Sequence, residues 1–338
     1  MNLQQRISIL VAMGKYMESQ APDWQSAKQT AFHKNIWFTP ENIDLACKNI
    51  VQNYLQADKL EVWASRYALP ETLPHPLTVG LVMAGNIPLV GFHDFLCVFI
   101  SGNKQKVKLS GKDDVLLLFL IREMQKRYPE LGAFVAFAEN LKGCDAYIAT
   151  GSNNAGRYFD YYFGKYPSII RRNRTSVALL DGTETRQDLE LLAEDIHSYF
   201  SLGCRNVTML YVPERYDFIP FIEVLKKYQF LMDYHKYKNN YDYRLAILLL
   251  NKKYYMSSGA LLLEENPVVF SPISTVHYQF CKNREAVEKE LETSEDIQAI
   301  VGKGYIGFGQ LQQPSLADYA DGVDTMQFLK GLDTQQTH

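Results

Sequence analysis

From residue 77 onward the chain alternates short apolar runs with stretches of helical periodicity, and this alternation limits the possible folds more than any other feature of the sequence. Four runs have the character of strands: LTVGLVMAG (77–85), KQKVKLS (104–110), GAFVAFA (132–138) and DAYIATG (145–151). The segments FHDFLCVFI and DDVLLLFLIREMQKRY lie between them and are predicted to be helices. The pattern predicts an α/β fold with a doubly wound sheet, whose ligand sites lie beyond the carboxyl ends of the strands.

Changes in this pattern divide the chain into four parts. Residues 1–75 are predicted to be helical, with Thr39 as an N-cap in front of Pro40. A proline-rich break, ALPETLPHPL, separates them from a cofactor-type domain at 76–174. A second α/β domain at 175–310 contains five apolar runs from which we expect a second sheet: TSVALLDG, NVTMLYVP, YRLAILLL, SSGALLL and STVHYQF. Residues 311–338 are a return segment with a frayed tail, GLDTQQTH.

Charge and cysteine content exclude several classes of protein. The 338 residues contain 35 Lys and Arg against 38 Asp and Glu, a formal net charge of −3, which argues against a nucleic-acid partner because such partners favour basic chains. No window approaches the roughly 18 apolar residues of a membrane span. The five cysteines are scattered, without a CxxC spacing, so we expect neither a disulfide framework nor a metal site and infer a reducing, cytoplasmic location.

Cys204 is the first candidate for chemistry. It lies in the turn SLGCRN, between a predicted helix that carries Tyr199 and Phe200 on its apolar face and the strand-like run at 206–213. The neighbouring Arg205 could favour the thiolate, which is the nucleophilic form of the side chain. The alternative is a buried structural cysteine, which is the common role of a single cysteine.

Two turns that follow predicted strands could bind a substrate or a cofactor. Asn86, in AGNIPL, could donate a hydrogen bond to a developing oxyanion, and the alternative is an Asx turn or a helix cap. The stretch ATGSNNAGR contains Gly151 and Ser152 and could present backbone amides and a helix N-terminus to an anion or a nicotinamide. A tight turn without a ligand is its alternative, because the stretch is not a GxGxxG dinucleotide motif.

Basic side chains are candidates for binding phosphate. Lys108, at the end of KVKLS, could reach a ribose or a phosphate, although lysines are common at strand ends. Arg171, Arg172 and Arg174 lie within four positions, and the planar guanidinium suits the phosphates of a nucleotide or of coenzyme A. A solvated basic loop is the alternative for these three arginines.

The order of these motifs resembles that of the aldehyde dehydrogenase superfamily and, within it, of the LuxC-type acyl-CoA reductases. AGNIPL is similar to the turn with the oxyanion asparagine, and SGNKQKVKLS, in which Lys108 follows Asn86 by 22 residues, is similar to the "GN…VKPS" strand. ATGSNNAGR is similar to the "FTGS…G" turn, SLGCRN to the turn with the nucleophilic cysteine, and VVFSPISTV to the "FGPV" strand. Each motif is weak alone, but their common order over residues 78–280 is specific.

The resemblance implies a fold and roles for individual residues. The fold is aldehyde dehydrogenase-like, with a Rossmann-type domain that binds NAD(P) and a smaller α/β catalytic domain. The catalytic residues are Cys204 as the nucleophile and Asn86, which stabilises the oxyanion together with the backbone N–H of Cys204. The implied cofactor residues are Lys108, Ser110 and Lys112 at the adenosine end, Gly151 and Ser152 near the nicotinamide or pyrophosphate, and Phe270.

Three departures from the family pattern refine the expected activity. Arg171 stands at the place of the general-base glutamate, which disfavours hydrolysis of a thioester to a free acid. Gly111, followed by Lys112, stands at the place of the glutamate that pairs with the adenosine ribose, so the local charge favours NADPH. Val268 stands at the place of the glutamate that holds the nicotinamide ribose and leaves Phe270 as the matching aromatic residue.

The resemblance therefore implies an acyl-CoA reductase, which forms an aldehyde from a fatty acyl-CoA or acyl-protein thioester through a thioester at Cys204. NADPH is the expected reductant and NADH the alternative. A semialdehyde dehydrogenase or an acyl phosphate reductase is the alternative within the superfamily. A non-reducing subunit that carries acyl groups for an acyl-activating partner protein is an alternative of another class, and a homo-oligomer is compatible with each of them.

Overall fold

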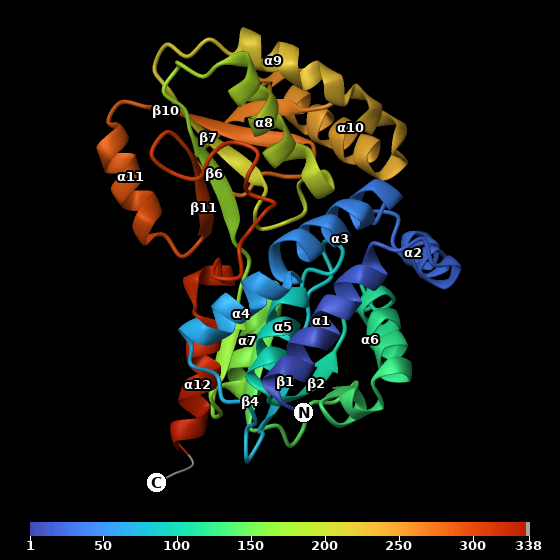
Figure 1. Cartoon of the computed structure of the whole chain (residues 1–338). Coiled ribbons are helices and arrows are strands. Elements are labelled where there is room, and N and C mark those ends of the chain that lie inside the picture. The colour runs from blue at the N-terminus through green and yellow to red at the C-terminus, as the bar shows by residue number, and fades with distance from the viewer. Residues whose placement is uncertain (336–338) are drawn as a thin grey trace. The chain divides into compact units, whose positions relative to one another are not determined.

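The computed structural model describes residues 1–335 and divides into two compact units, which we describe separately (Figure 1). The first unit comprises Met1–Asn173 together with the segment that starts at Pro314, and the second unit comprises Arg174–Gln313. The α-helices described in the first unit are α1 (Leu3–Met17), α2 (Pro22–Lys34), α3 (Pro40–Tyr54), α4 (Ala57–Arg66), α5 (Phe92–Ser101), α6 (Leu116–Arg127), α7 (Asn153–Phe163) and α12 (Thr325–Gln335). Those described in the second unit are α8 (Arg186–His197), α9 (Ile219–Leu225), α10 (His235–Leu250) and α11 (Arg284–Thr293).

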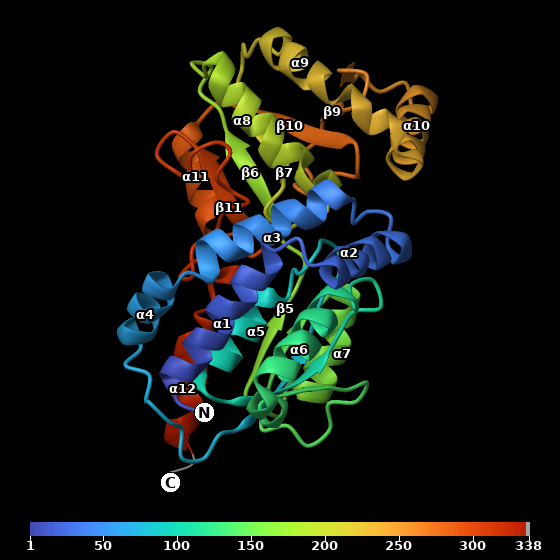
Figure 2. The ribbon, with the colours of Figure 1, turned by 45° about the vertical axis from the view of Figure 1, so that its right-hand side comes forward.

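A parallel sheet of five strands forms the centre of the first unit. In spatial order the strands are β3 (Val135–Phe137), β2 (Lys104–Lys108), β1 (Thr78–Val82), β4 (Ala146–Thr150) and β5 (Ser168–Arg171). The chain runs from β1 outwards to β3 and then starts again at β4, so the strand order reverses between β1 and β4. With right-handed crossovers, α5 and α6 cover one face of this sheet and α7 covers the other (Figure 2).

The N-terminal helices share the core of this first unit. Trp24 of α2 and Trp63 of α4 are buried, and the core that contains them continues through α5 and α6 to Met326 of α12. Helix α3 begins as predicted, because the side chain of Thr39 accepts a hydrogen bond from the Asn42 N–H in front of a proline at the first helical position. The predicted N-cap is therefore confirmed.

A sheet of six strands forms the centre of the second unit. In spatial order the strands are β11 (Ile297–Gly302), β6 (Thr175–Leu179), β7 (Val207–Pro213), β10 (Thr275–Cys281), β9 (Leu262–Glu265) and β8 (Met256–Ser257). Neighbouring strands are parallel except for β8 and β9. Strand β6 is buried on both faces, since Ala178 belongs to the core shared with α8 and α9, whereas Val177 and Leu179 belong to the core shared with α11.

Most of the predicted strands are present, but some predictions of secondary structure are wrong. The apolar run at 243–250 is the end of α10 and not a strand, and Leu250 in it is 79% exposed. Strand β5 includes Arg171, for which a basic loop was one of the two alternatives. Within the predicted frayed tail, residues 331–335 belong to α12, and residues 336–338 lie outside the described part of the chain.

Several kinds of feature are absent from residues 1–335. No helix in this range is long and apolar enough to cross a lipid bilayer. No group of three His, Cys, Asp or Glu side chains in the same range could hold a metal ion. The five cysteines, which all lie in this range, form no disulfide.

Candidate active site

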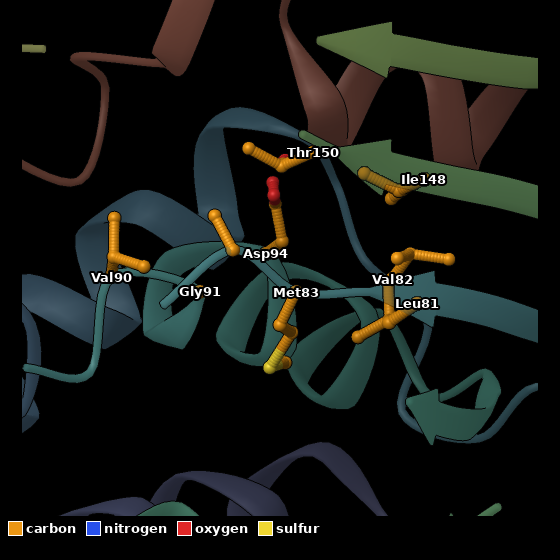
Figure 3. Close-up of a pocket in the computed structure, with 9 residues that line it drawn as sticks. Leu81, Val82, Met83, Val90, Gly91, Asp94, Ile148 and Thr150 are labelled. Atoms are coloured by element: carbon orange, nitrogen blue, oxygen red, sulfur yellow. The ribbon is translucent and has the colours of Figure 1, made fainter. Parts of the chain in front are cut away.

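The first unit has a pocket at the point where its strand order reverses. The pocket has an empty volume of about 240 Å³, which includes space open to solvent (Figure 3). Asp94 and Thr150 supply its polar side chains, and the Asp94 carboxylate is directed towards Thr150. The rest of the lining comes from the ends of β1 and β4 and the start of α5, and consists of Leu81, Val82, Met83, Ala84, Val90, Gly91 and Ile148. A doubly wound sheet is expected to bind its ligand at this position.

A buried ion pair neutralises the charge of Asp94. The Arg171 guanidinium is 2% exposed, and its Nη2 donates to Asp94 Oδ1 at 2.8 Å and to Thr325 Oγ1 at 2.8 Å. Nη1 of the same side chain donates to the Ala320 carbonyl. Arg171 therefore joins the pocket to the C-terminal segment of the first unit.

The three neighbouring arginines have separate environments, and they do not form the cluster that the sequence indicated. Arg171 ends β5 in the interior, so both sequence-based interpretations, a phosphate site and a solvated loop, are wrong for this residue. Arg172 is exposed and pairs with Asp160 at 2.7 Å. Arg174 belongs to the second unit and donates to the Ile297 carbonyl at 3.1 Å.

Residues 84–91 lie between β1 and α5, and we call them the Asn86 turn. Asn86 is exposed, and the N-cap position of α5 is Gly91, so the helix-cap alternative for Asn86 is wrong. Leu89 has a left-handed backbone with φ of 57°, which residues other than glycine rarely adopt. The buried Asp113 accepts the Leu89 N–H through Oδ2 at 2.7 Å and holds this conformation.

The Asn86 turn packs closely against the loop that follows β2. A Cβ atom on Gly85 would lie 2.6 Å from Ser110 Oγ, so no larger residue fits there without movement. The Asp113 N–H donates to the Ser110 carbonyl at 2.9 Å. Burial raises the pKa of Asp113 to about 7, the Leu89 N–H opposes this shift and the charge of Asp114 adds to it. An ionisable group thus holds the loops after β1 and β2 together.

None of the predicted cofactor residues of the first unit lines the pocket. They lie at or after the ends of β2 and β4: Lys108, Ser110, Lys112, Gly151 and Ser152. Lys108 Nζ donates to the Glu139 carbonyl at 3.0 Å, whereas Lys112 is exposed. The Ser152 side chain caps α7 by accepting the Ala155 N–H at 3.3 Å. The predicted strand-to-helix turn is therefore confirmed, while its role in binding stays a prediction.

In the second unit, residues 199–206 lie between α8 and β7, and we call them the Cys204 turn. Cys204 is half-buried in this turn. Burial raises the pKa of the other four thiols: the pKa of Cys47 to about 12, that of Cys97 well above its usual range, and those of Cys144 and Cys281 in the same direction. A thiol with a raised pKa stays protonated and is a poor nucleophile at neutral pH. These four cysteines are therefore weak candidates for a nucleophile.

Three consecutive residues before Cys204 have a left-handed backbone. The φ angles are 53° at Tyr199, 55° at Phe200 and 61° at Ser201. The helix that was expected to carry Tyr199 and Phe200 ends at His197, which corrects the prediction. A left-handed conformation costs an L-residue about 1–2 kcal/mol, so this turn persists only because surrounding contacts determine it.

Hydrogen bonds hold the chain on both sides of Cys204. Asn206 Oδ1 accepts the Gly203 N–H at 2.8 Å, and the Asn206 N–H donates to the Gly203 carbonyl at 3.1 Å. Ser176 Oγ, from β6, donates to the Cys204 carbonyl at 3.0 Å. Gln312 Nε2 donates to the next carbonyl, that of Arg205, at 3.1 Å. Three successive carbonyls of the turn are thus oriented, one by Asn206 within the turn and two by other parts of the second unit.

Two buried titratable groups lie near the end of α8. Burial lowers the pKa of His197 to about 4, so its ring is neutral, and it stacks on Tyr228 with 3.9 Å between the ring centroids. Burial raises the pKa of Asp195 to about 7, although the N–H groups of Gly309 and Leu311 oppose the shift by donating to its carboxylate at 2.7 and 3.3 Å. His197 is a packing residue, and Asp195 holds the segment that precedes Gln312.

Phe270 lies in the loop between β9 and β10, and its neighbours hold the backbone of that loop. Val268, one of these neighbours, is 54% exposed, and its carbonyl is 2.6 Å from His277 Nδ1 of β10. Thr208 Oγ1 of β7 donates to the Val269 carbonyl at 2.6 Å. The predicted aromatic residue therefore follows two positions whose carbonyls are bonded to the sheet.

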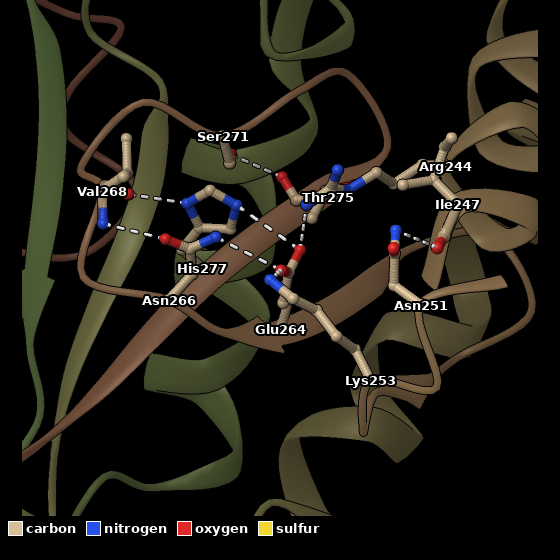
Figure 4. Close-up of polar contacts among 10 residues, drawn as sticks. All are labelled: Arg244, Ile247, Asn251, Lys253, Glu264, Asn266, Val268, Ser271, Thr275 and His277. Carbon is tan, nitrogen blue, oxygen red and sulfur yellow. Dashed lines mark hydrogen bonds and ion pairs between the residues drawn. The ribbon is translucent and has the colours of Figure 1, made fainter. Parts of the chain in front are cut away.

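A buried ion cluster supports His277 (Figure 4). Glu264 is 1% exposed and pairs with Arg244 and with Lys253, and its Oε2 lies 3.8 Å from His277 Nε2. Burial alone would raise the pKa of Glu264, but hydrogen bonds from Arg244 and Lys253 lower it. Burial lowers the pKa of His277, so its ring is neutral: Nδ1 donates to the Val268 carbonyl, and Nε2 makes no hydrogen bond.

The residues that support the pocket and the two turns were not among those predicted from the sequence. A signal exists for Asp94, because it is the only Asp, Glu, Lys or Arg in the apolar segment FHDFLCVFI. No comparable signal marks Asp113 or Asn206, because their roles depend on contacts made only in the folded chain.

Comparisons with known proteins identify the fold. No protein-family model and no curated protein matches the sequence. Aldehyde dehydrogenase 21 from Physcomitrella patens, in complex with the reaction product succinate, is similar in structure at 14% identity, with a TM-score of 0.67 over 98% of this chain and 84% of that chain. Gamma-glutamyl-gamma-aminobutyraldehyde dehydrogenase from Burkholderia cenocepacia J2315 is 14% identical, with a TM-score of 0.60 over 89% of this chain and 71% of that chain.

An aldehyde dehydrogenase from Bacillus cereus in complex with NAD+ is also similar, at 13% identity and a TM-score of 0.60 over 89% of this chain and 72% of that chain. Identities this low show the fold alone. The fold is that of the aldehyde dehydrogenases, with a Rossmann-type unit and a second α/β unit. The predicted fold class is confirmed.

Proposed function

We propose that this protein reduces an acyl thioester, such as a fatty acyl-CoA, to an aldehyde with NADPH through a thioester at Cys204. The observation that carries the proposal is the Cys204 turn, in which a half-buried thiol follows three left-handed residues and is held on both sides. Strained backbone of this kind concentrates at functional sites. Burial raises the pKa of the other four thiols, so they stay protonated at neutral pH.

In the proposed reaction, the Cys204 thiolate forms a bond to the carbonyl carbon of the acyl thioester. The Asn86 side-chain amide and the Cys204 N–H are the proposed donors to the resulting oxyanion. When this intermediate collapses, the bond from the carbon to the sulfur of coenzyme A breaks, and the leaving thiolate takes up a proton. NADPH, when bound, supplies a hydride to the acyl carbon on Cys204. The same donors serve the second oxyanion, whose collapse releases the aldehyde and restores the Cys204 thiolate.

We propose that the nicotinamide end of the cofactor binds at the mouth of the pocket in the first unit, where the strand order reverses. Its apolar walls suit a flat ring, and Asp94 and Thr150 suit a carboxamide, which both donates and accepts hydrogen bonds. We assign Lys108, Ser110 and Lys112 to the adenosine end, and Gly151, Ser152 and Phe270 to the nicotinamide side. The exposed Lys112, next to Gly111, adds positive charge that supports a preference for NADPH over NADH.

Arg171 supports reduction over oxidation to a free acid. Formation of an acid requires a base that activates water for attack on the thioester. The family resemblance aligns Arg171 with that base, and a guanidinium cannot accept a proton. The side chain is also buried and paired with Asp94. A thioester at Cys204 would therefore persist until it is reduced.

Mass spectrometry and NADPH oxidation test the proposal together. Without NADPH, the wild-type protein should gain one acyl group at Cys204 from acyl-CoA of a suitable chain length, and addition of NADPH should remove it as the aldehyde. Cys204→Ala should lower NADPH oxidation at least about a thousandfold, because the nucleophile is lost. Cys281→Ala removes the other half-buried cysteine and should leave both measurements unchanged.

The outcomes separate this proposal from its alternatives. NADPH oxidation by Cys204→Ala at the wild-type rate would show that the mechanism is wrong. An acyl group that forms on Cys204 but resists NADPH would indicate an acyl-carrying subunit that serves an acyl-activating partner. Activity with an acyl phosphate, or with a semialdehyde and NADP+, but not with acyl-CoA would indicate another reaction of the same fold.

A further inference from the structure

The side-chain amide of Asn206 makes hydrogen bonds to residues of the second unit. It is fully buried at the end of the Cys204 turn. Its Nδ2 donates to the carbonyls of Ser198 at 2.8 Å and Asp195 at 2.9 Å, and the Ile196 carbonyl is farther away at 3.4 Å. Its Oδ1 accepts the Gly203 N–H at 2.8 Å. One side-chain amide therefore joins the end of α8 to the residue that precedes the nucleophile.

This amide bonds two carbonyls at the end of α8, where the chain enters the left-handed path of residues 199–201. Helix α8 ends at His197, and the last carbonyls of a helix have no partner within it. The left-handed residues cannot supply that partner by continuing the helix. Asn206 bonds the carbonyls of Asp195 and Ser198 instead. Without its amide, the carbonyls of Asp195 and Ser198 would each lose a hydrogen bond, and the strained turn would be free to relax.

Asn206 also fixes the peptide plane that carries the Cys204 N–H. Its own N–H donates to the Gly203 carbonyl at 3.1 Å. Because the peptide group is planar and trans, the direction of that carbonyl sets the opposite direction for the Cys204 N–H. On the other side, Ser176 Oγ holds the Cys204 carbonyl at 3.0 Å. The orientation of the Cys204 backbone is therefore set by two buried polar residues of the second unit.

We propose that Asn206 is the positioning residue of Cys204. Asn206 holds residues 199–201 in their left-handed conformation and directs the Cys204 N–H towards the oxyanion formed on the cysteine. The inference rests on the proposed thioester chemistry and adds to it a residue that touches neither substrate nor cofactor. A residue that contributed only stability would affect every reaction of Cys204 alike. A positioning residue affects acyl transfer, which forms an oxyanion, more than alkylation, which forms none.

Asn206→Asp tests this difference, because aspartate keeps the size and the Oδ1 acceptor but loses the two Nδ2 donors. The matched control is Asn103→Asp in the first unit, where a buried amide accepts the Leu77 N–H at 2.9 Å and donates to Ser101 Oγ at 3.1 Å. Two rates are measured for the folded protein and located on Cys204 by mass spectrometry. One is alkylation by iodoacetamide at a pH where the thiol is ionised in both variants. The other is acylation by acyl-CoA and by a p-nitrophenyl ester.

We expect Asn206→Asp to slow acylation by at least about tenfold with either acyl donor, while alkylation stays within about threefold of wild type. Asn103→Asp should leave both rates unchanged. Equal changes in acylation and alkylation, or no change in either, would overturn the inference and leave Asn206 a structural role only.

A second variant covers the case in which Asn206→Asp does not fold. Ser176→Ala removes the hydrogen bond to the Cys204 carbonyl and should slow acylation by about threefold with alkylation unchanged; wild-type acylation would overturn the inference. If wild-type Cys204 reacts with the ester but not with acyl-CoA, the proposed function fails, and the ester rates still decide the role of Asn206. If neither donor acylates Cys204, both proposals fail.

Discussion

The Asn86 turn and the Cys204 turn share a conformational feature but are held by chemically different groups. Each contains left-handed residues other than glycine, namely Leu89 in the first unit and residues 199–201 in the second. A buried side chain accepts one backbone N–H in each turn: Asp113 accepts from Leu89 at 2.7 Å, and Asn206 accepts from Gly203 at 2.8 Å. The holding group is an ionisable carboxyl in the first case and a neutral amide in the second.

This difference means that the two turns respond to different conditions. Burial raises the pKa of Asp113 to about 7, so the charge of the group that holds the Asn86 turn changes near neutral pH. The amide of Asn206 does not titrate in this range. The carboxylate of Asp195 accepts the N–H groups of Gly309 and Leu311, and its backbone carbonyl accepts from Asn206. Titration of Asp195 can therefore affect the Cys204 turn through Asn206. We expect pH to act directly on the Asn86 turn and only indirectly on the Cys204 turn.

The largest expected effect concerns the pH dependence of stability, and Asp113→Asn tests it. The unfolded chain loses the Asp113 proton near the ordinary pKa of 3.8, whereas the folded protein keeps it until about pH 7. Between these values only the folded state holds the proton, so the contribution of this group to the free energy of unfolding falls as the pH rises. From about pH 5 to about pH 8 this fall is about 3 kcal/mol, and Asp113→Asn should remove it.

Urea unfolding followed by tryptophan fluorescence measures this effect in the first unit, because all three tryptophans belong to it: Trp24, Trp37 and Trp63. Asp195→Asn is the matched control, since burial also raises the pKa of Asp195 to about 7 but this residue lies in the second unit. The control should leave the pH dependence of the fluorescence transition unchanged. An equal change in both variants would contradict the separate pH responses of the two turns.

The second prediction concerns the close packing of the Asn86 turn. A Cβ atom on Gly85 would lie 2.6 Å from Ser110 Oγ and 2.7 Å from Ser110 Cβ, so Gly85→Ala must displace the loop after β2 and should lower the free energy of unfolding by about 2 kcal/mol. NADPH binding, measured by fluorescence titration, should weaken, while alkylation of Cys204 should keep its wild-type rate.

Gly111→Ala is the control for this substitution, because it lies in the same loop and a Cβ there would meet nothing within 4 Å. It should be neutral or stabilising by up to about 1 kcal/mol, since alanine has less backbone freedom than glycine in the unfolded chain. Wild-type stability and NADPH affinity in Gly85→Ala would show that the contact with Ser110 does not constrain the turn.

The central strands of both sheets could be predicted from the sequence because a parallel strand buried on both faces is a continuous apolar run. Strands β1 and β7 are examples, and both lie within their predicted runs. The prediction fails where an apolar run has another cause. YRLAILLL ends α10, where leucine and alanine favour a helix. Strand β5 lies at the edge of its sheet and has Ser168 and Arg171 at its ends, so it lacks a continuous apolar run.

Cys204 could be selected from the sequence because its motif occurs in a recognisable order, but the residues that hold the turns could not. Asp113 accepts from a residue 24 positions earlier, and Asn206 donates to a carbonyl 11 positions earlier. Such contacts depend on the folded chain, and no local pattern encodes them. The left-handed residues 199–201 are Tyr, Phe and Ser, so the sequence lacks the glycine that usually marks this conformation.

The smallest expected effect separates strain from hydrogen bonding in the Cys204 turn. Ser201 has φ of 61°, and its Oγ donates to the Ile196 carbonyl at 2.6 Å. Ser201→Ala loses this bond and keeps the strain, so it should lower the free energy of unfolding by about 1 kcal/mol.

Ser201→Gly loses the same bond but adopts this φ without a steric cost. The free energy of unfolding of Ser201→Gly, measured by urea unfolding followed by circular dichroism, should therefore exceed that of Ser201→Ala by up to about 1 kcal/mol. This holds even though glycine gains more backbone entropy on unfolding. Acylation of Cys204 should remain near the wild-type rate in both variants, because Asn206 still holds the turn. A glycine variant less stable than the alanine variant would contradict the strain at Ser201. The Cys204 turn would then differ from the Asn86 turn in backbone strain as well as in the charge of the group that holds it.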